Sequence, residues 1–98
     1  MRFEWDAAKN RRNLRKHGIG FKTAQLVFDD PHALSIQDRV VEGEERWQTS
    51  GLVLGTVIVV VAHTWWEEDG EEAVRIIPAR KAGSAERRAY EDAHESSG

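Results

Sequence analysis

The chain of 98 residues contains no cysteine and only two prolines. The absence of cysteine excludes a disulfide framework and any thiolate-bound metal, and it is compatible with a reducing cytoplasm. The longest apolar run, Val57 to Ala62, has six residues, whereas a membrane span needs about 20. Glu4 and Asp6 lie where a signal peptide would carry its apolar segment. We therefore expect a soluble, cytoplasmic protein with no membrane contact.

The composition is otherwise that of an ordinary globular protein, with 40% hydrophobic and 32% charged residues. A chain of this length buries somewhat over ~60% of the surface that its unfolded state exposes, which allows one modest core. We find no repeat, linker or low-complexity segment. The expectation is one domain over residues 1–98, with an ordered core from about 2 to 94 and a frayed tail.

Charge is distributed unevenly along the chain, although the net charge is only −3. Residues 1–28 carry a net +5, residues 29–72 a net −9, and residues 73–98 a net +1. The overall charge therefore says little about binding partners, and the local patches carry the information.

Three helices are predicted from spacing and end signals. Asp6 is a suitable N-cap for a helix over Ala7 to about His17, and Gly18 suits its left-handed C-terminus. The apolar spacing of residues 21–28 predicts a second helix, which Asp29-Asp30-Pro31 ends. A third helix is expected from Ala85 to about His94.

The remaining segments predict strands separated by turns. A short first strand contains Phe3 and Trp5, and the valine-rich segment Val57 to Trp66 is expected in the middle of the sheet. Further strands are expected over His32–Gln37, Arg46–Leu54 (broken by Gly51) and Ala73–Ala79, with a loop over Asp38–Glu44 and turns at Gly55-Thr56 and Glu67–Glu72. The order β-α-α-β-β-β-β-α predicts an α+β fold rather than a parallel α/β sheet.

Basic residues interrupt and end the last predicted strand. Arg75 lies within an apolar segment, and Arg80 and Lys81 lie at its end. A half-buried arginine needs an acid or an anion, and its planar guanidinium suits phosphate. Strict alternation places Arg75 and Arg80 on opposite faces, but a bulge at Pro78 would bring them onto one face. The alternative is that Arg75 only pairs across the sheet with an acid such as Glu45.

A histidine and a basic helix are further candidates. His63, late in the central strand, has the chemistry of a general acid or base, and its alternative is a structural, hydrogen-bonded histidine. The first helix carries a basic cluster that suits a nucleic-acid backbone or an acidic partner protein, unless it is merely solvated: Arg11, Arg12, Arg15, Lys16 and His17. The four tryptophans are able to stack on bases but are explained first as sheet and core residues.

Neither a metal nor an organic cofactor is predicted. The four histidines show no ligand spacing, and the acids of residues 67–72 are typical of a solvated turn. The sequence also contains no P-loop, dinucleotide-binding fingerprint or nucleophile elbow.

A set of short segments follows one another along the chain: Phe3-Glu4-Trp5-Asp6 with Lys9 and Asn13; Arg15-Lys16-His17-Gly18, Phe21 and Ala24; Val27-Phe28-Asp29-Asp30-Pro31; Gly43-Glu44-Glu45-Arg46 and Gly51; Arg75-Ile76-Ile77, Ala79-Arg80-Lys81-Ala82; and Glu86-Arg87 with Tyr90. In these segments and in their order, the sequence resembles the BrnT-type toxins of bacterial toxin–antitoxin modules over about residues 3–91. One departure is Pro78, where the family pattern is expected to have a serine.

The resemblance implies a compact fold similar to RelE-type ribonuclease toxins, with helices packed on an antiparallel sheet. It also implies RNA cleavage that halts translation. It also implies neutralisation by a cognate DNA-binding antitoxin, expected to be of the ribbon-helix-helix type, in a hetero-oligomer that represses its own operon. The toxin would then touch DNA only through the antitoxin.

The leading hypothesis is a metal-independent endoribonuclease. In such chemistry the ribose 2′-hydroxyl attacks the adjacent phosphate, and Arg75 and Arg80 would stabilise the added negative charge. Lys81 would hold a flanking phosphate, and Glu45 or His63 would accept the proton. The alternatives are a module that docks a partner protein and one that binds nucleic acid without cleaving it.

Overall fold

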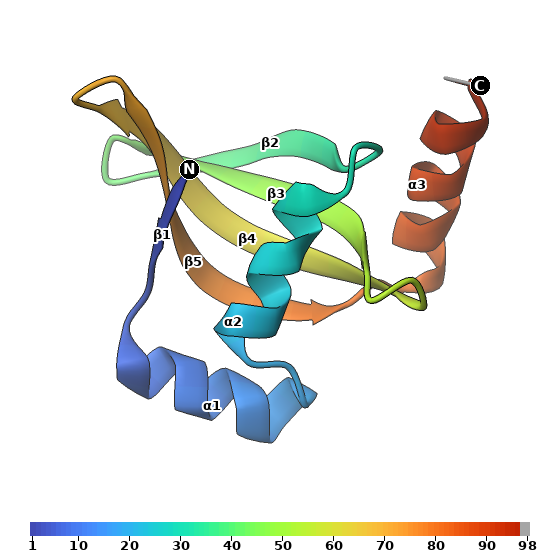
Figure 1. Cartoon of the computed structure of the whole chain (residues 1–98), viewed down its shortest axis with the longest axis horizontal. Coiled ribbons are helices and arrows are strands. Elements are labelled where there is room, and N and C mark those ends of the chain that lie inside the picture. The colour runs from blue at the N-terminus through green and yellow to red at the C-terminus, as the bar shows by residue number, and fades with distance from the viewer. Residues whose placement is uncertain (97–98) are drawn as a thin grey trace.

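Five strands form one sheet in the computed structural model, which describes residues 1–96 (Figure 1). Across the sheet the order is β1 (Arg2–Glu4), β5 (Glu71–Lys81), β4 (Val57–Glu68), β3 (Glu44–Val53) and β2 (Leu34–Val41). The α+β class is confirmed. The sheet is mixed rather than wholly antiparallel, because β1 pairs in parallel with β5 while the other neighbours are antiparallel. β1 and β5 are separated by most of the chain, so no hairpin turn joins them and requires an antiparallel pairing.

Four helical segments accompany the sheet: α1 (Ala7–His17), α2 (Phe21–Ala24), the 3₁₀ helix η1 (Gln25–Asp29) and α3 (Ser84–Ser96). The expected ends of α1 are confirmed, since Asp6 accepts the Lys9 N–H at 2.9 Å and Gly18 has a φ of 71°. The predicted helix over residues 21–28 is instead split into α2 and η1. Within residues 1–96, no helix is long and apolar enough to cross a membrane.

The strands are longer than their sequence pattern predicts. The expected loop over residues 38–44 is largely strand, because β2 continues to Val41 and β3 begins at Glu44. The turn expected over residues 67–72 shrinks to Asp69-Gly70. An exposed edge strand needs hydrogen bonds on one side only, so it forms without an alternating apolar pattern.

Two further expectations concern Gly51 and the tail. β3 runs through Gly51 without a break. A Cβ there would lie 2.8 Å from the Val27 carbonyl oxygen, so glycine is required by the close approach of η1. In the predicted frayed tail, α3 continues to Ser96, and Ser97 and Gly98 lie outside the described residues.

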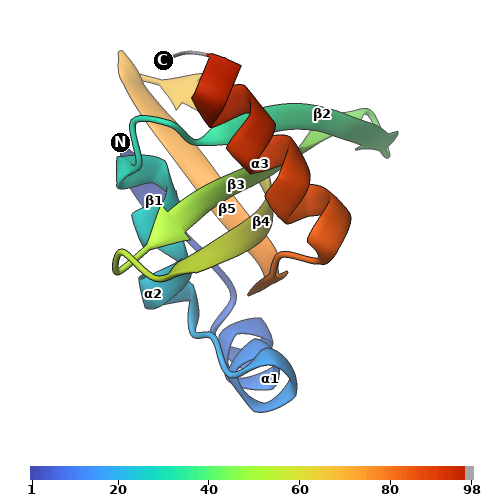
Figure 2. The ribbon, with the colours of Figure 1, turned by 90° about the vertical axis from the view of Figure 1, so that its right-hand side faces the viewer.

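The inner face of the sheet is the face covered by α2 and η1 (Figures 1 and 2). Phe21, Ala24 and Val27 of these helices are fully buried against it. The strand residues of this core are mostly small and branched: Val59, Val61, Val74, Ile76 and Ala79. α3 lies apart from α2 and η1, at one end of the sheet and toward its opposite, outer face (Figures 1 and 2). It covers that end of the outer face and leaves the rest more open.

A bulge in β5 determines which residues reach the outer face. β4 advances two residues from Val61 to His63 while β5 takes three from Ile76 to Ala79, so β5 carries one extra residue around Pro78. The expected bulge is thus present. Because directly paired residues share a face, the pairs Val60–Arg80 and Thr64–Arg75 put both arginines on the outer face.

Candidate nucleic-acid interface

Arg75 lies on the outer face between an acid and an aromatic ring. Its Nε donates to the Glu4 carboxylate at 3.3 Å, and its guanidinium lies 5.6 Å from the centre of the Trp66 ring. The alternative of an acid across the sheet is therefore right in kind, but the acid is Glu4 of β1 rather than Glu45. About half of the Arg75 side chain remains exposed, so the pair is a weak, screened one.

Arg80 is held more firmly, by the first turn of α3. Its two terminal nitrogens donate to the two oxygens of Glu86 at 2.6 and 2.5 Å, and Nη1 also donates to the Lys81 carbonyl. Glu86 additionally accepts the Gly83 N–H. The hydrogen bonds that Glu86 accepts from Arg80 and Gly83 lower its pKa to about 2, and the bonds that Arg80 donates to Glu86 raise the pKa of Arg80. Among residues 1–96, the Arg80 Nε–H has no hydrogen-bond acceptor, so it is a further donor that an anion could use.

The two arginines are well separated along the sheet. Their partners on β4, Thr64 and Val60, are four residues apart, which corresponds to about 13 Å between the arginine Cα atoms. Arg75 is held by Glu4, while Arg80 is held by Glu86 at the other end of β5. In this arrangement they suit different phosphates of one strand better than a single phosphate.

Asn13 fixes the basic helix α1 to β5. Its carboxamide donates to the carbonyls of Ile19 and Ala79 at 2.8 Å and accepts the Ala79 N–H at 3.1 Å. The side chain thus replaces a neighbouring strand beyond the point where β1 ends. Because Asn13 is buried, these bonds hold α1 at a defined position beside Pro78.

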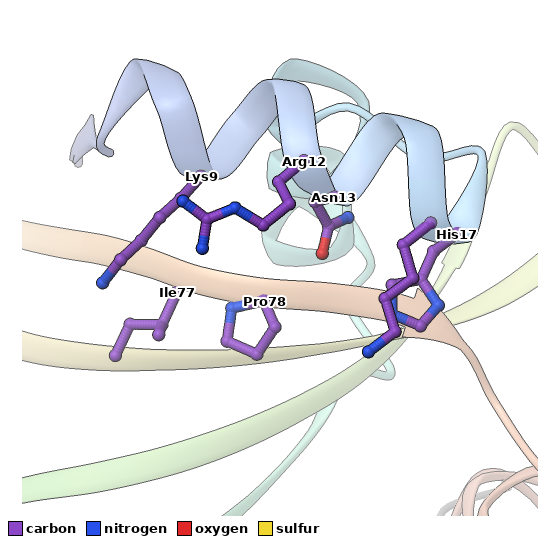
Figure 3. A pocket seen from close by; sticks show the side chains of 7 residues that line it. Lys9, Arg12, Asn13, His17, Ile77 and Pro78 are labelled. Atoms are coloured by element: carbon purple, nitrogen blue, oxygen red, sulfur yellow. The ribbon is translucent and has the colours of Figure 1, made fainter.

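Two adjoining hollows meet at His17 and Pro78. In the first, the side chains of Lys9, Arg12 and His17 extend from α1 toward Ile77 and Pro78, as Figure 3 shows. The second continues over the outer face of the sheet to Arg80. We call them together the basic trough, because its lining includes Lys9, Arg12, Lys16, His17, Arg39 and Arg80, with Asp38 as the acid of the lining.

The structure does not bring every predicted site residue to this trough. Arg11 and Arg15 are exposed on α1 but do not line it. Lys81 pairs with Val59 and so lies on the inner side of β5, opposite to Arg80. Glu45 is exposed near the start of β3, two residues from the inner-face residue Trp47. Neither Lys81 nor Glu45 shares a surface with Arg80.

His63 lies on the inner face, on the other side of the sheet from the arginines. It is 4% exposed, and its Nε2 lies 2.7 Å from the Thr49 hydroxyl. Phe28 packs edge-on against the ring at 4.9 Å. Burial lowers the pKa of His63, so the ring is neutral at pH 7. The structure agrees with the structural alternative for this residue.

Sequence reasoning missed several residues that shape the trough: Lys9, Arg39, Gln48, Asn13 and Glu86. Arg39 falls in the segment that was expected to be a loop. Asn13 and Glu86 belong to the segments that carry the family resemblance, but no spacing rule connects either residue to β5. Within residues 1–96, no group of three or more histidines and acids is placed to hold a metal ion.

Comparisons with known proteins agree with this architecture. A solved structure of the Brucella abortus ribonuclease toxin BrnT matches with a TM-score of 0.65 and 23% identity, covering 86% of this chain and 99% of that one. At this identity the likeness establishes the fold. No curated protein matches. The family model described as the ribonuclease toxin BrnT of type II toxin–antitoxin systems matches residues 5–86. Since that match covers most of the chain, the protein belongs to the BrnT family of ribonuclease toxins.

Proposed function

We propose that the protein is an endoribonuclease that binds RNA along the basic trough and cleaves it beside Arg80. The observation that carries this proposal is the continuity of the trough, in which His17 and Pro78 join the cations of α1 to Arg80. A row of cations beside an open sheet face suits the phosphates of a single strand. Membership in a ribonuclease toxin family supports the same activity.

The proposed reaction is attack of a ribose 2′-hydroxyl, which loses its proton, on the adjacent phosphate. It forms a 2′,3′-cyclic phosphate and breaks the bond to the 5′-oxygen of the next nucleotide, which takes up a proton and leaves as a hydroxyl. Arg80 would donate hydrogen bonds to the phosphate as negative charge develops on it, and Glu86 would hold the guanidinium in place. His17, which lines both hollows, is our candidate for proton transfer. It takes the role that the sequence suggested for His63 or Glu45, which lie outside the trough.

Arg75 has a different role in this proposal. At about 13 Å from Arg80 along the sheet, it would bind a flanking phosphate or stack on a base next to Trp66. Its loss should therefore weaken RNA binding more than it slows the bond-breaking step.

The test is cleavage of a defined RNA by the parent and by Arg80→Ala, with EDTA and with added magnesium. We expect Arg80→Ala to cut about 10²–10³ times more slowly and the parent to be unaffected by EDTA. Lys81→Ala is the matched control, since Lys81 adjoins Arg80 but lies on the other side of β5. Retained RNA without products would identify a binding module, and equal rates for Arg80→Ala and the parent would move the site elsewhere.

In the cell, we propose that this whole chain acts as one toxin domain in the cytoplasm, where RNA cleavage inhibits translation. A cognate antitoxin, expected to be a ribbon-helix-helix protein, would neutralise it and link it to DNA. Type II toxin–antitoxin family membership supports such a partner. Co-expression tests this: growth arrest by the parent should be relieved by the protein encoded next to it, and Arg80→Ala should cause no arrest.

A further inference from the structure

A separate hollow lies on the inner face, on the other side of the sheet from the basic trough. Its position follows from the register, because Trp47 pairs with the inner-face residue His63 and Trp65 pairs with Val74. Its volume is about 310 Å³, at the small end of ligand pockets, which is room for one side chain. We call it the aromatic–acidic pocket; its lining includes Phe28, Ser35, Trp47, His63, Trp65 and Glu72.

Two of the residues that line this pocket are tryptophans. Trp47 on β3 and Trp65 on β4 come from neighbouring strands and face the same side of the sheet. Trp65 is 47% exposed, although tryptophan side chains are on average largely buried. Exposed indoles around a small cavity are a recurrent means of binding a cation, since the ring face attracts positive charge.

The floor of the pocket is a neutral chain of hydrogen bonds. The Ser35 and Thr49 hydroxyls lie 2.8 Å apart, and Thr49 lies 2.7 Å from His63 Nε2. His63 Nδ1 lies 3.2 Å from the Thr64 carbonyl, an acceptor, so the proton belongs on Nδ1 and Nε2 accepts from Thr49. Ser35 then donates to Thr49, and its own lone pairs are left to accept from a ligand. The floor thus presents an acceptor and no positive charge.

The rim of the pocket is acidic. Glu72 lines it, and the register pairs Glu72 with Glu67, which therefore faces the same side. Arg2, on the neighbouring edge strand, pairs with Glu68 on the outer face and so does not neutralise these two acids. The two carboxylates on this side of the sheet repel a nucleic-acid backbone and favour a cation.

We propose that the aromatic–acidic pocket receives an arginine side chain of a partner protein, the antitoxin that the toxin–antitoxin family implies. A guanidinium would lie against the indoles of Trp47 and Trp65 and donate to Glu72 and to Ser35. The partner would then be anchored on the inner face, while RNA uses the outer face. The proposal rests on the pocket and on family membership, and it does not depend on where RNA is cleaved.

The test is a titration of the ¹⁵N-labelled protein with the peptide acetyl-Gly-Arg-Gly-amide, followed through the four indole N–H resonances. We expect those of Trp47 and Trp65 to shift, whereas Trp5 and Trp66 stay in place. The matched peptide with citrulline, which has the shape of arginine without its charge, should leave all four unmoved. Equal shifts with citrulline would overturn the proposal. So would shifts of Trp47 and Trp65 caused by an RNA oligonucleotide, which would make this a base-stacking site.

Variants identify the groups that carry the binding. Glu72→Gln and Trp65→Ala should each raise the Kd for the arginine peptide about twofold to fivefold. Glu71→Gln is the matched control, since Glu71 is the neighbouring acid but pairs with Glu68 on the outer face. An equal loss in Glu71→Gln would mean diffuse charge attraction and would contradict a defined pocket.

A further variant and an activity measurement distinguish a binding defect from a folding defect. Trp65→Phe should restore much of the affinity that Trp65→Ala loses, because it restores an aromatic face. RNA cleavage by Glu72→Gln should equal that of the parent, because the trough lies on the other face. The tests can therefore disprove the pocket proposal without disproving the ribonuclease proposal, and the reverse.

Discussion

Gly51 shows at the scale of one residue how closely η1 approaches the sheet. A Cβ at this position would lie 2.8 Å from the Val27 carbonyl oxygen and 2.9 Å from its Cγ1. We predict that Gly51→Ala lowers the free energy of unfolding by about 1–3 kcal/mol, as overpacking does. Urea unfolding measures it. Gly83→Ala is the control, since its new Cβ would meet the Glu86 carboxylate at an ordinary contact distance of 3.5 Å; an equal loss there would contradict the steric explanation.

His63 gives a prediction about pH. Burial lowers its pKa in the folded state, so below pH of about 6.5 the unfolded chain takes up a proton that the folded protein resists. Stability is therefore present above that pH and is lost as the pH falls. His63→Gln, which can still accept from Thr49, should lose less stability between pH 7.5 and 5.5 than the parent. Urea unfolding at the two pH values measures this, and parallel losses would show that His63 titrates normally.

Side-chain hydrogen bonds hold α3 to the rest of the molecule at two places. Its first turn holds Arg80 through Glu86, and farther along the Tyr90 hydroxyl donates to Asp30 at 2.5 Å. Burial and this hydrogen bond raise the pKa of Tyr90 to about 12, so the phenol stays protonated and remains a donor. The position of α3 and the orientation of Arg80 are thereby linked.

Glu86→Gln tests this link. The folded-state pKa of Glu86, about 2, lies below its ordinary value of 4.5. Its contribution to stability is therefore present above pH 4.5 and is lost as the pH falls toward 2. The difference in stability between the parent and Glu86→Gln should be largest near pH 6 and vanish near pH 2, as measured by thermal unfolding. Glu91→Gln, an exposed change of the same charge on α3, should show no such convergence.

The elements were predictable where a local signal sets their ends. α1 starts and stops as expected because Asp6 and Gly18 act within one turn of the chain. The split into α2 and η1 was not predictable, since a three-residue step such as Ala24 to Val27 suits a 3₁₀ helix as well as an α-helix. Edge strand β2 was predicted only in part, because most of its residues are exposed and buried positions do not alternate with exposed ones along it.

The site was predictable to a similar extent. The bulge at Pro78 depends on the local sequence, so it could be predicted, and that prediction correctly placed Arg75 and Arg80 on one face. Whether His63 shares that face depends on the register between β4 and β5, which the sequence does not specify. Partners such as Glu86 and Arg39 come from other elements, so their approach to Arg80 becomes visible only in three dimensions.

At the scale of the whole molecule, the small net charge conceals two faces of opposite character. The outer side carries the basic trough, whereas the inner side carries the aromatic–acidic pocket. Under the two proposals, RNA would bind on the outer face and a basic segment of the partner protein on the inner face.

This arrangement predicts a strong salt dependence of RNA binding. Each phosphate neutralised on a single strand contributes about −0.7 to the slope of log K against log salt. Lys16→Ala should therefore make the slope less steep by about 0.7, measured with a 2′-deoxy-substituted oligonucleotide that cannot be cleaved. Lys22→Ala, an exposed charge on α2 outside the trough, should leave the slope unchanged. An effect of equal size at Lys22 would argue against a localised binding track.

The junction of the two ends of the chain has a consequence for how the toxin is made. β1 and Asn13 near the start bond to β5 near the end, across 66 residues in the case of Asn13 and Ala79. During synthesis the contacts of α1 with β5 form only after β5 has left the ribosome. A nascent chain that has not yet exposed β5 therefore has no basic trough, because Pro78 and Arg80, which line it, belong to β5.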